Sequence, residues 1–327
     1  MRITAALLCL LALPACAAPA PAPTATPLTL ATWNPEWLLL PQEFDELMQN
    51  CVPSGVRAGG SERAVYCNLG AERRWSEADL DRLAGFAATI DADVIALQET
   101  DGVAAARRLF PEHELCFTAR QHVQNVGFAI RRGLPHRCND DYRALGLATN
   151  DVRWGADITL FPGTAREIRL LAVHLKAGCA WDPLNANRDP CRVLSQQVPV
   201  LEAWIDARAA EGTHFAVLGD FNRQLGRERA PARDEAGRMI ALWPEIDDGD
   251  PPGANLTNAG ATARPVVCRP GDPLRPPIDH LVLGETLAAA LVDGSYRMWP
   301  YPTQPAGARW PDHCIFTVTI DTARLGE

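Results

Sequence analysis

The sequence predicts a single domain of the α/β class, in which mixed β-strands alternate with helices in a layered sandwich. Short apolar runs of strand length are separated by stretches with helical spacing, and several adjacent runs are joined by turn residues. The chain has 327 residues, of which 47% are hydrophobic and 22% charged, so it is long enough for a large core and has an ordinary globular composition.

The N-terminus has the pattern of a secretory signal. Residues 1–16 contain one early arginine followed by an apolar run, which predicts export from the cytoplasm. Leu13-Pro14-Ala15-Cys16 resembles a bacterial lipobox that leaves a lipidated Cys16 as a membrane anchor, while Ala15-Cys16-Ala17 equally fits ordinary signal cleavage. Residues 17–27 predict an extended tether of Ala, Pro and Thr. We expect the folded domain over 28–327, in the periplasm, at the outer membrane or secreted.

Eight cysteines follow this leader, and an even number in an exported protein predicts disulfides. Pairing by proximity joins Cys51 to Cys67, Cys116 to Cys138 and Cys179 to Cys191, and leaves Cys268 for Cys314. Other pairings are compatible with the sequence. No Cys-x-x-Cys motif is present, which argues against a structural zinc site.

The predicted elements follow one another along the whole domain. A strand at 28–33 precedes a loop-like insertion at 41–75, and a capping box at Ser76–Asp79 starts a helix that continues to Ile90. Further strands are predicted at 93–97, 115–118, 126–131, 156–161, 167–173, 215–218, 278–283 and 317–320, and helices at 103–110 and 193–210. Pro199 should kink the last helix or mark its true start.

Polar residues stand at the ends of these apolar runs. They are acids, amides and histidines: Asn34, Glu99, His174, Asp220, Asn222, Asp279, Asp312 and His313. Sheets of α/β proteins bind their ligands at such strand ends, so we expect these side chains to converge. Gly219 permits a sharp turn or a close backbone approach beside Asp220.

This inventory favours metal-assisted chemistry on a phosphate. Oxygen-rich ligands suit Mg²⁺ or Mn²⁺ better than zinc. Histidines beside such a cation can donate to phosphate oxygens whose charge grows in the transition state, or move a proton together with a carboxylate. A Gly-x-Ser-x-Gly elbow, a Walker loop and a dinucleotide fingerprint are all absent from the sequence.

The charge balance limits the class of partner. The net charge of −9 argues against a chain that coats itself in nucleic acid, because non-specific binding to phosphate backbones needs a basic face. A local basic cleft is compatible with a group of arginines in one region, although scattered solvated side chains are the simpler interpretation: Arg131, Arg132, Arg137, Arg143 and Arg153.

The order of these motifs resembles the endonuclease/exonuclease/phosphatase superfamily, which has the deoxyribonuclease I-like fold. The matching segments are Trp33-Asn34, Gln98-Glu99, His174-Leu175, Gly219-Asp220-Phe221-Asn222, Ile278-Asp279-His280 and Asp312-His313. The resemblance implies a four-layer α/β/β/α sandwich of two mixed sheets. It also implies Mg²⁺-dependent hydrolysis of a phosphoester by in-line attack of water.

The resemblance also implies residue roles. For the metal it implies Glu99 with Asn34 and Asp312 beside it, and Glu36 is a further candidate because some members have an aspartate there. For catalysis it implies His313 oriented by Asp279, Asp220 and Asn222 for the nucleophile and phosphate, and His174, which occurs in the deoxyribonuclease and sphingomyelinase branches. Arg153 is a candidate phosphate contact.

Three functions are compatible with this pattern. The first is an exported, monomeric phosphodiesterase, most simply a nuclease acting on DNA or RNA. The second is a phosphomonoesterase or a sphingomyelinase-like lipid diesterase, for which Trp299, Tyr301 and Trp310 could form an exposed aromatic hairpin, unless they pack in the core. The third is a non-catalytic envelope binding protein on the same fold.

Overall fold

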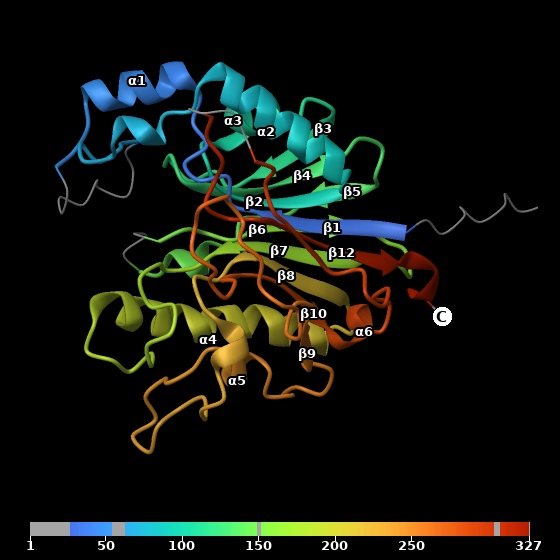
Figure 1. Ribbon diagram of the computed structural model, residues 1–327. Helices are drawn as coiled ribbons and strands as arrows, with labels where there is room; N and C mark the ends of the chain where they lie inside the picture. The colour runs from blue at the N-terminus through green and yellow to red at the C-terminus, as the bar shows by residue number, and fades with distance from the viewer. Residues whose placement is uncertain (1–26, 54–62, 149–151, 304–307, 327) are drawn as a thin grey trace, which may run out of the picture.

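The computed structural model describes residues 27–53, 63–148, 152–303 and 308–326. The predicted signal at 1–16, Cys16 and almost all of the tether lie outside the described residues. Within these ranges two six-stranded sheets pack face to face, with α1, α2 and α3 outside one sheet and α4 and α5 outside the other (Figure 1). The predicted four-layer α/β/β/α sandwich of mixed sheets is confirmed.

The first sheet has the strand order β11-β12-β1-β2-β4-β3. Its strands are β1 (Pro27–Trp33), β2 (Val94–Thr100), β3 (His113–Phe117), β4 (Asn125–Arg131), β11 (Arg297–Trp299) and β12 (Ile315–Asp321). The helices outside it are α1 (Pro41–Gln49), α2 (Glu77–Ile90) and α3 (Gly102–Leu109). Because β1 is parallel to β2 and antiparallel to β12, the carboxyl ends of β1 and β2 meet the start of β12 at one edge.

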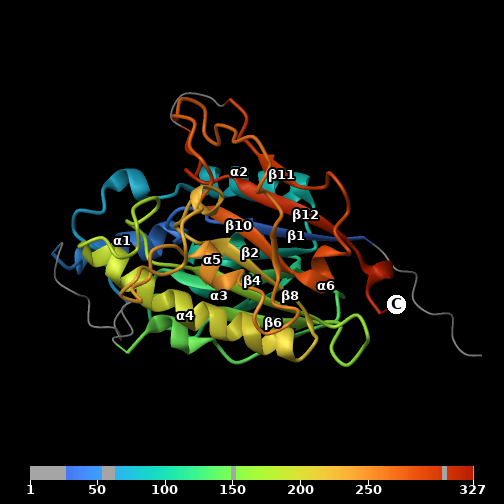
Figure 2. The same ribbon diagram turned by 90° about the horizontal axis from the view of Figure 1, so that it is seen from below.

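The second sheet has the strand order β5-β6-β7-β8-β10-β9. Its strands are β5 (His136–Cys138), β6 (Ala156–Leu160), β7 (Ile168–His174), β8 (His214–Asp220), β9 (Leu256–Asn258) and β10 (Asp279–Gly284). Figure 2 shows α4 (Asp189–Ala210) and α5 (Trp243–Ile246) lying over this sheet. The remaining short elements are α6 (Glu285–Ala288) and 3₁₀ turns at Ala71–Arg73, Arg143–Gly146, Leu225–Arg227 and Thr322–Arg324.

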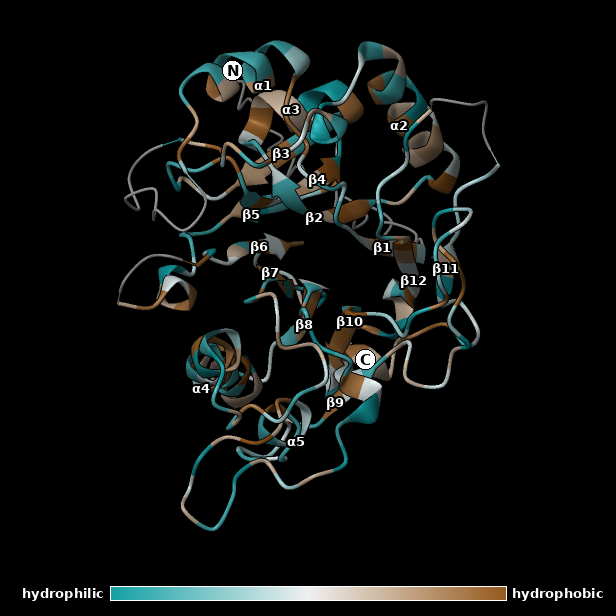
Figure 3. Ribbon diagram, turned by 60° about the vertical axis from the view of Figure 1, so that its left-hand side comes forward, coloured by the Kyte–Doolittle hydropathy of each residue, from teal (hydrophilic) through white to brown (hydrophobic). Residues whose placement is uncertain are grey.

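Three apolar clusters hold the four layers together. The central cluster joins the facing sides of both sheets through residues such as Leu30, Phe128 and Leu218. A second lies between the second sheet and α4, and a third lies between the first sheet and the helices α2 and α3. The strands in the middle of each sheet are therefore covered on both faces, which explains their nearly unbroken apolar sequences. Figure 3 shows the same layers coloured by hydropathy.

Most predicted elements are present, and three details differ. Ser76 and Asp79 form the predicted capping box of α2. Part of the insertion predicted as a loop is the helix α1, which begins with Pro41 in its first turn and buries Phe44. The helix predicted at 193–210 begins earlier, at Asp189, and Pro199 lies inside it rather than at its start. A proline in the first turn is a good helix start, and Pro190 provides it here.

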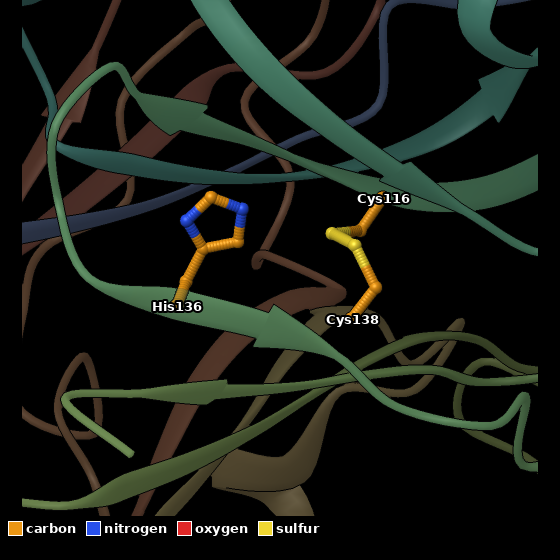
Figure 4. Close-up of side chains that lie close together, drawn as sticks. All are labelled: Cys116, His136 and Cys138. Atoms are coloured by element: carbon orange, nitrogen blue, oxygen red, sulfur yellow. A yellow bond between two sulfur atoms is a disulfide. The ribbon is translucent and has the colours of Figure 1, made fainter.

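The eight cysteines form the four disulfides expected from proximity, namely Cys51–Cys67, Cys116–Cys138, Cys179–Cys191 and Cys268–Cys314. The Cys116–Cys138 bond links β3 to β5, so it ties the edges of the two sheets together. His136 lies beside this bond, but a cysteine pair joined to each other does not bind a metal ion (Figure 4). None of the helices in the described ranges has the length and apolar character needed to cross a bilayer.

Replacing Gly219 by alanine should destabilise the fold. The residue has φ of 147°, and a Cβ placed there would lie 2.0 Å from the carbonyl oxygen of Val173 on the neighbouring strand. We expect Gly219→Ala to lower the free energy of unfolding in urea by at least about 2 kcal/mol, because overpacking forces the strands apart. The control is Gly85→Ala, since Gly85 is exposed on α2 with free space around it. Its stability should rise by about 0.5–1 kcal/mol; equal effects at both positions would contradict the argument.

Candidate active site

Strand register brings three polar side chains of the second sheet together. β8 pairs in parallel with β7, which places His174 opposite Asp220, and antiparallel with β10, which places Asp279 opposite Asp220. Directly paired residues point to the same face, about 5 Å apart. The three side chains therefore form one row at the end of the sheet, and all three are buried.

The first sheet contributes Asn34, just after β1, and Glu99, near the end of β2. A register irregularity between Leu97 and Thr100 marks a β-bulge, and Glu99 has a positive φ of 47° within it. Bulges commonly re-aim side chains beside functional sites. The bulge is held in place because the backbone amide of Trp37 donates to Glu99 Oε2 at 3.1 Å and that of Leu38 donates to the Glu99 carbonyl at 2.8 Å.

Asn34 and His174 connect the acids of the two sheets. The Asn34 amide donates to Asp220 Oδ2 at 3.2 Å and to Glu99 Oε1 at 3.4 Å. His174 Nε2 lies 3.5 Å from the same Asp220 oxygen and 3.8 Å from Glu99 Oε1. The Asn34 side-chain oxygen accepts from the backbone amide of Glu36. In this conformation Asn34 therefore orients the two carboxylates through its NH₂ group.

His313 and Asp279 form a hydrogen-bonded pair, with 2.7 Å between His313 Nδ1 and Asp279 Oδ2. The ligand atoms of His313, Asp279 and Asp220 all lie within 4.8 Å of one another. The backbone around His313 is fixed because its carbonyl accepts a 2.6 Å bond from the Tyr301 hydroxyl, which itself accepts from Trp33 Nε1 at 2.8 Å. The carboxylate thus holds one imidazole nitrogen and leaves Nε2 for the site, facing the exposed Asp312 at 3.8 Å.

Burial and crowding shift the pKa values of these groups. Burial, together with the nearby Asp279 carboxylate, raises the pKa of Asp220 to about 7. Burial opposes the charged form of His313, but the Asp279 charge and hydrogen bond prevail and hold its pKa well above the ordinary value. Burial, reinforced by the positive charge of Arg153, keeps the pKa of His174 well below its ordinary value. The site thus combines a cationic and a neutral histidine with an acid near neutrality.

The donor set fits a hard divalent cation. Glu99 and Asp220 approach the same two polar groups from opposite sheets, and a second carboxylate, Asp279, lies against Asp220. One oxygen of Asp279 is buried without a hydrogen-bond partner among the described residues. Crowded, buried carboxylates of this kind are stabilised by a bound cation, and carboxylate oxygens are the ligands that Mg²⁺ and Mn²⁺ prefer.

Glu36 lies in a different environment from these acids. Its carboxylate contacts Arg73 and Arg309, with Arg269 Nη1 3.9 Å away. Arg309 in turn stacks over the Trp75 ring at 3.6 Å. Both Glu36 oxygens therefore face guanidinium groups, which were not foreseen because the three arginines come from separate loops. Burial and then the Asp312 charge raise the pKa of Glu36, so the metal role predicted for Glu36 stays a prediction beside this arginine-bound one.

Arg153 lies close to the acids and to His174. Its guanidinium donates to the carbonyl of Leu175 at 3.1 Å, and the Asn222 amide donates to the same carbonyl at 3.1 Å. Glu99 and Asp220 are close enough to Arg153 to act on its charge, while burial lowers its pKa. Arg153 therefore stands beside the acids, where a phosphate contact was predicted. Asn222 is held next to the same acids, because its backbone amide donates to Asp220 at 2.7 Å.

A cavity of about 340 Å³ opens next to His313 and Asp279. Trp181 and Arg275, which the sequence analysis did not single out, are among its lining residues. The aromatic residues considered for lipid contact instead lie inside the protein: Tyr301 and Trp310 are buried and stacked on each other, and Trp299 is half-buried. Core packing, the alternative considered for these three residues, is the one that the structure shows.

Solved structures with a similar arrangement of elements include three that cover 90% of this chain. Truncated TDP2 from Caenorhabditis elegans is 12% identical with a TM-score of 0.56, over 90% of this chain and 98% of that one. The human nocturnin catalytic domain with bound sulfate anion is 15% identical, with a TM-score of 0.54, over 90% and 92%. The 3′ phosphatase NExo from Neisseria, bound to a product DNA hairpin, is 15% identical, with a TM-score of 0.55, over 90% and 99%. At these identities the likeness establishes the fold.

Family-level comparison gives the identity of the domain. Curated protein sequences provide no match to the chain. The model of the Endonuclease/Exonuclease/phosphatase family matches residues 65–318, which is most of the described chain and includes every candidate site residue except Asn34 and Glu36. The chain therefore belongs to the endonuclease/exonuclease/phosphatase family and is a phosphoric ester hydrolase that depends on a divalent metal ion.

Proposed function

We propose that this protein is an exported, Mg²⁺-dependent phosphodiesterase that hydrolyses nucleic acid by in-line attack of water. The observation that supports this most directly is the Asp279–His313 hydrogen bond beside the buried Asp220, because it provides acid, base and electrostatic groups within one small site. The intact set of groups speaks against a non-catalytic binding protein on the same fold. When bound, Mg²⁺ supplies charge neutralisation on the phosphate and stabilises the leaving oxygen.

The remaining roles belong to the protein's own side chains. Glu99 and Asp220 would hold the metal and orient the attacking water, and Asn34 donates hydrogen bonds to both carboxylates. His313, kept cationic by Asp279, donates to the phosphate or to the leaving oxygen through Nε2. His174, kept neutral, and Asn222 contact the non-bridging oxygens, where developing negative charge strengthens a hydrogen bond. Arg153 adds a fixed positive charge on the far side of the phosphate.

Two further observations support the choice of substrate and compartment. The related folds named above include one solved with a product DNA hairpin, so the scaffold accommodates nucleic acid in that protein. Four disulfides fit an oxidising compartment outside the cytoplasm. We propose export through the predicted signal, with Cys16 as the lipid anchor where lipobox processing occurs, and a monomeric enzyme.

His313→Ala and Asp220→Ala should each lower the turnover of bis-p-nitrophenyl phosphate and of plasmid DNA by at least about 10²–10³-fold, the usual loss for one transition-state group. The oxidised protein from residue 28 onward is assayed with Mg²⁺, and circular dichroism checks that each variant is folded. The matched control is His136→Ala, because His136 lies beside the Cys116–Cys138 disulfide rather than in the site. Near-native hydrolysis by either active-site variant would remove these residues from the mechanism.

Metal binding distinguishes Glu99 from Glu36. EDTA should abolish hydrolysis and Mg²⁺ or Mn²⁺ should restore it. In calorimetric titrations with Mn²⁺, Glu99→Gln should weaken binding at least tenfold. Glu36→Gln should leave the affinity nearly unchanged and instead lower stability by about 1–3 kcal/mol, because it leaves a half-buried guanidinium cluster without its counter-charge.

The opposite result would restore the metal role for Glu36. Loss of Mn²⁺ binding in Glu36→Gln, with unchanged urea stability, would show that the arginines hold a metal ligand in place rather than a structural carboxylate. Urea denaturation with and without EDTA keeps the two effects separate, because a ligand stabilises only the protein that binds it.

A further inference from the structure

Exposed apolar side chains gather beside the cavity at His313. Trp181 lines the cavity and is 68% exposed, the largest value among the large hydrophobic residues in the described ranges that are exposed. Leu274 is 59% exposed and stands between the lining residues Pro273 and Arg275, and Val267 is 37% exposed on the same loop. Exposed apolar residues on and beside a cavity commonly mark a binding site.

The loop that carries Trp181 is held by a disulfide and by two residues that follow Asn222 in the chain. The Cys179–Cys191 disulfide closes it, and Arg223 donates to the carbonyls of Cys179 and Asp182 at 2.7 and 2.6 Å. The backbone amide of Gln224 donates to the carbonyl of Ala180 at 2.9 Å. Arg223 and Gln224 directly follow Asn222, so the segment that bears Asp220 and Asn222 also holds both chain neighbours of Trp181.

The second loop is fixed to the catalytic histidine in the same way. The Cys268–Cys314 disulfide joins it to the residue after His313, and both cysteines line the cavity. The backbone amide of Tyr301 donates to the carbonyl of Cys268 at 2.8 Å. Arg269 pairs with Asp272 at 3.1 Å. The cavity therefore has rigid walls at a set distance from His313, which reduces the entropy lost when a ligand binds.

We propose that Trp181 is a stacking platform for an unpaired nucleobase next to the scissile phosphate, so that the substrate is single-stranded nucleic acid or a nucleotide ester. The proposal rests on the phosphodiesterase function above and names its substrate class. An indole whose backbone is held on both sides offers a flat face to any base, and base–aromatic stacking tolerates all sequences. A base within a duplex already stacks on both sides and has to be extruded first.

The lining favours a nucleotide over a lipid. A volume of about 340 Å³ suits one ring system and its sugar rather than two acyl chains, and is at the small end of ligand pockets. Arg275 lines the cavity and suits a flanking phosphate, while Gln224 offers an amide to a base edge.

Binding without turnover tests the platform separately from the proposed activity. Fluorescence anisotropy of labelled oligothymidylate is measured in EDTA at one fixed salt concentration, for the wild type and for Trp181→Ala, Trp181→Leu and Trp181→Phe. We expect Trp181→Ala and Trp181→Leu to weaken binding about tenfold and Trp181→Phe to retain most of it. The control is Tyr66→Ala, which removes an exposed aromatic next to another disulfide, away from the cavity, and should change nothing. Equal affinity in all Trp181 variants would overturn the platform.

Hydrolysis then identifies what Trp181 recognises. With Mg²⁺, Trp181→Ala should lower kcat/KM about tenfold for the p-nitrophenyl ester of thymidine 5′-phosphate and leave methyl p-nitrophenyl phosphate unchanged. Equal losses on both esters would make Trp181 a structural residue and overturn the proposal. Loss of binding to sphingomyelin–phosphatidylcholine vesicles, with unchanged oligothymidylate affinity, would make it a lipid contact. Absence of hydrolysis by the wild type, with the expected anisotropy result, would refute the phosphodiesterase function alone.

Discussion

The pairing of β8 with β7 on one side and with β10 on the other is the constraint on which the site depends. This register sets His174, Asp220 and Asp279 in one row, and a slip by one residue would turn every one of them to the other face of the sheet. Gly219 allows the strands to approach this closely, because its missing Cβ leaves room for the Val173 carbonyl. Backbone geometry at the residue directly before Asp220 therefore decides whether the acids meet.

The same register places buried carboxylates close together, and the stability of the rest of the fold offsets their repulsion. Two buried carboxylates, Asp220 and Asp279, face each other, and Glu99 approaches from the opposite sheet. The apolar clusters between the two sheets, and between each sheet and its helices, contribute the free energy of folding that offsets this repulsion. Burial and, after it, the Asp279 charge raise the pKa of Asp220, while the Asp279 charge and hydrogen bond raise the pKa of His313. Crowded negative charge of this kind suits a site that binds a metal ion.

The sequence predicts the layered fold, the disulfide pairs and the residues at strand ends, because periodicity and position along the chain determine these features. It does not predict contacts made between loops. The arginines around Glu36 come from three separate segments, and the Tyr301 hydroxyl reaches the His313 carbonyl only once β11 and β12 pair. Pattern analysis does not single out Trp181 for a related reason, since its role depends on the residues that lie beside it in the folded structure. The helix α1 was missed because nine residues give too short a periodic signal.

Chemistry and recognition are divided between two kinds of structure in this protein. The acids and histidines stand on or next to strands of the two sheets, where register fixes them. Many of the residues that line the neighbouring cavity stand on two loops. One loop is joined by a disulfide to α4, and the other is joined to Cys314, the residue after His313. Loops elsewhere tolerate change because few contacts depend on them. Here the disulfide to Cys314 holds the start of the loop between Cys268 and Asp279 next to His313. Under the role proposed for Trp181, substrate recognition depends on side chains that take no part in the Asp279–His313 hydrogen bond.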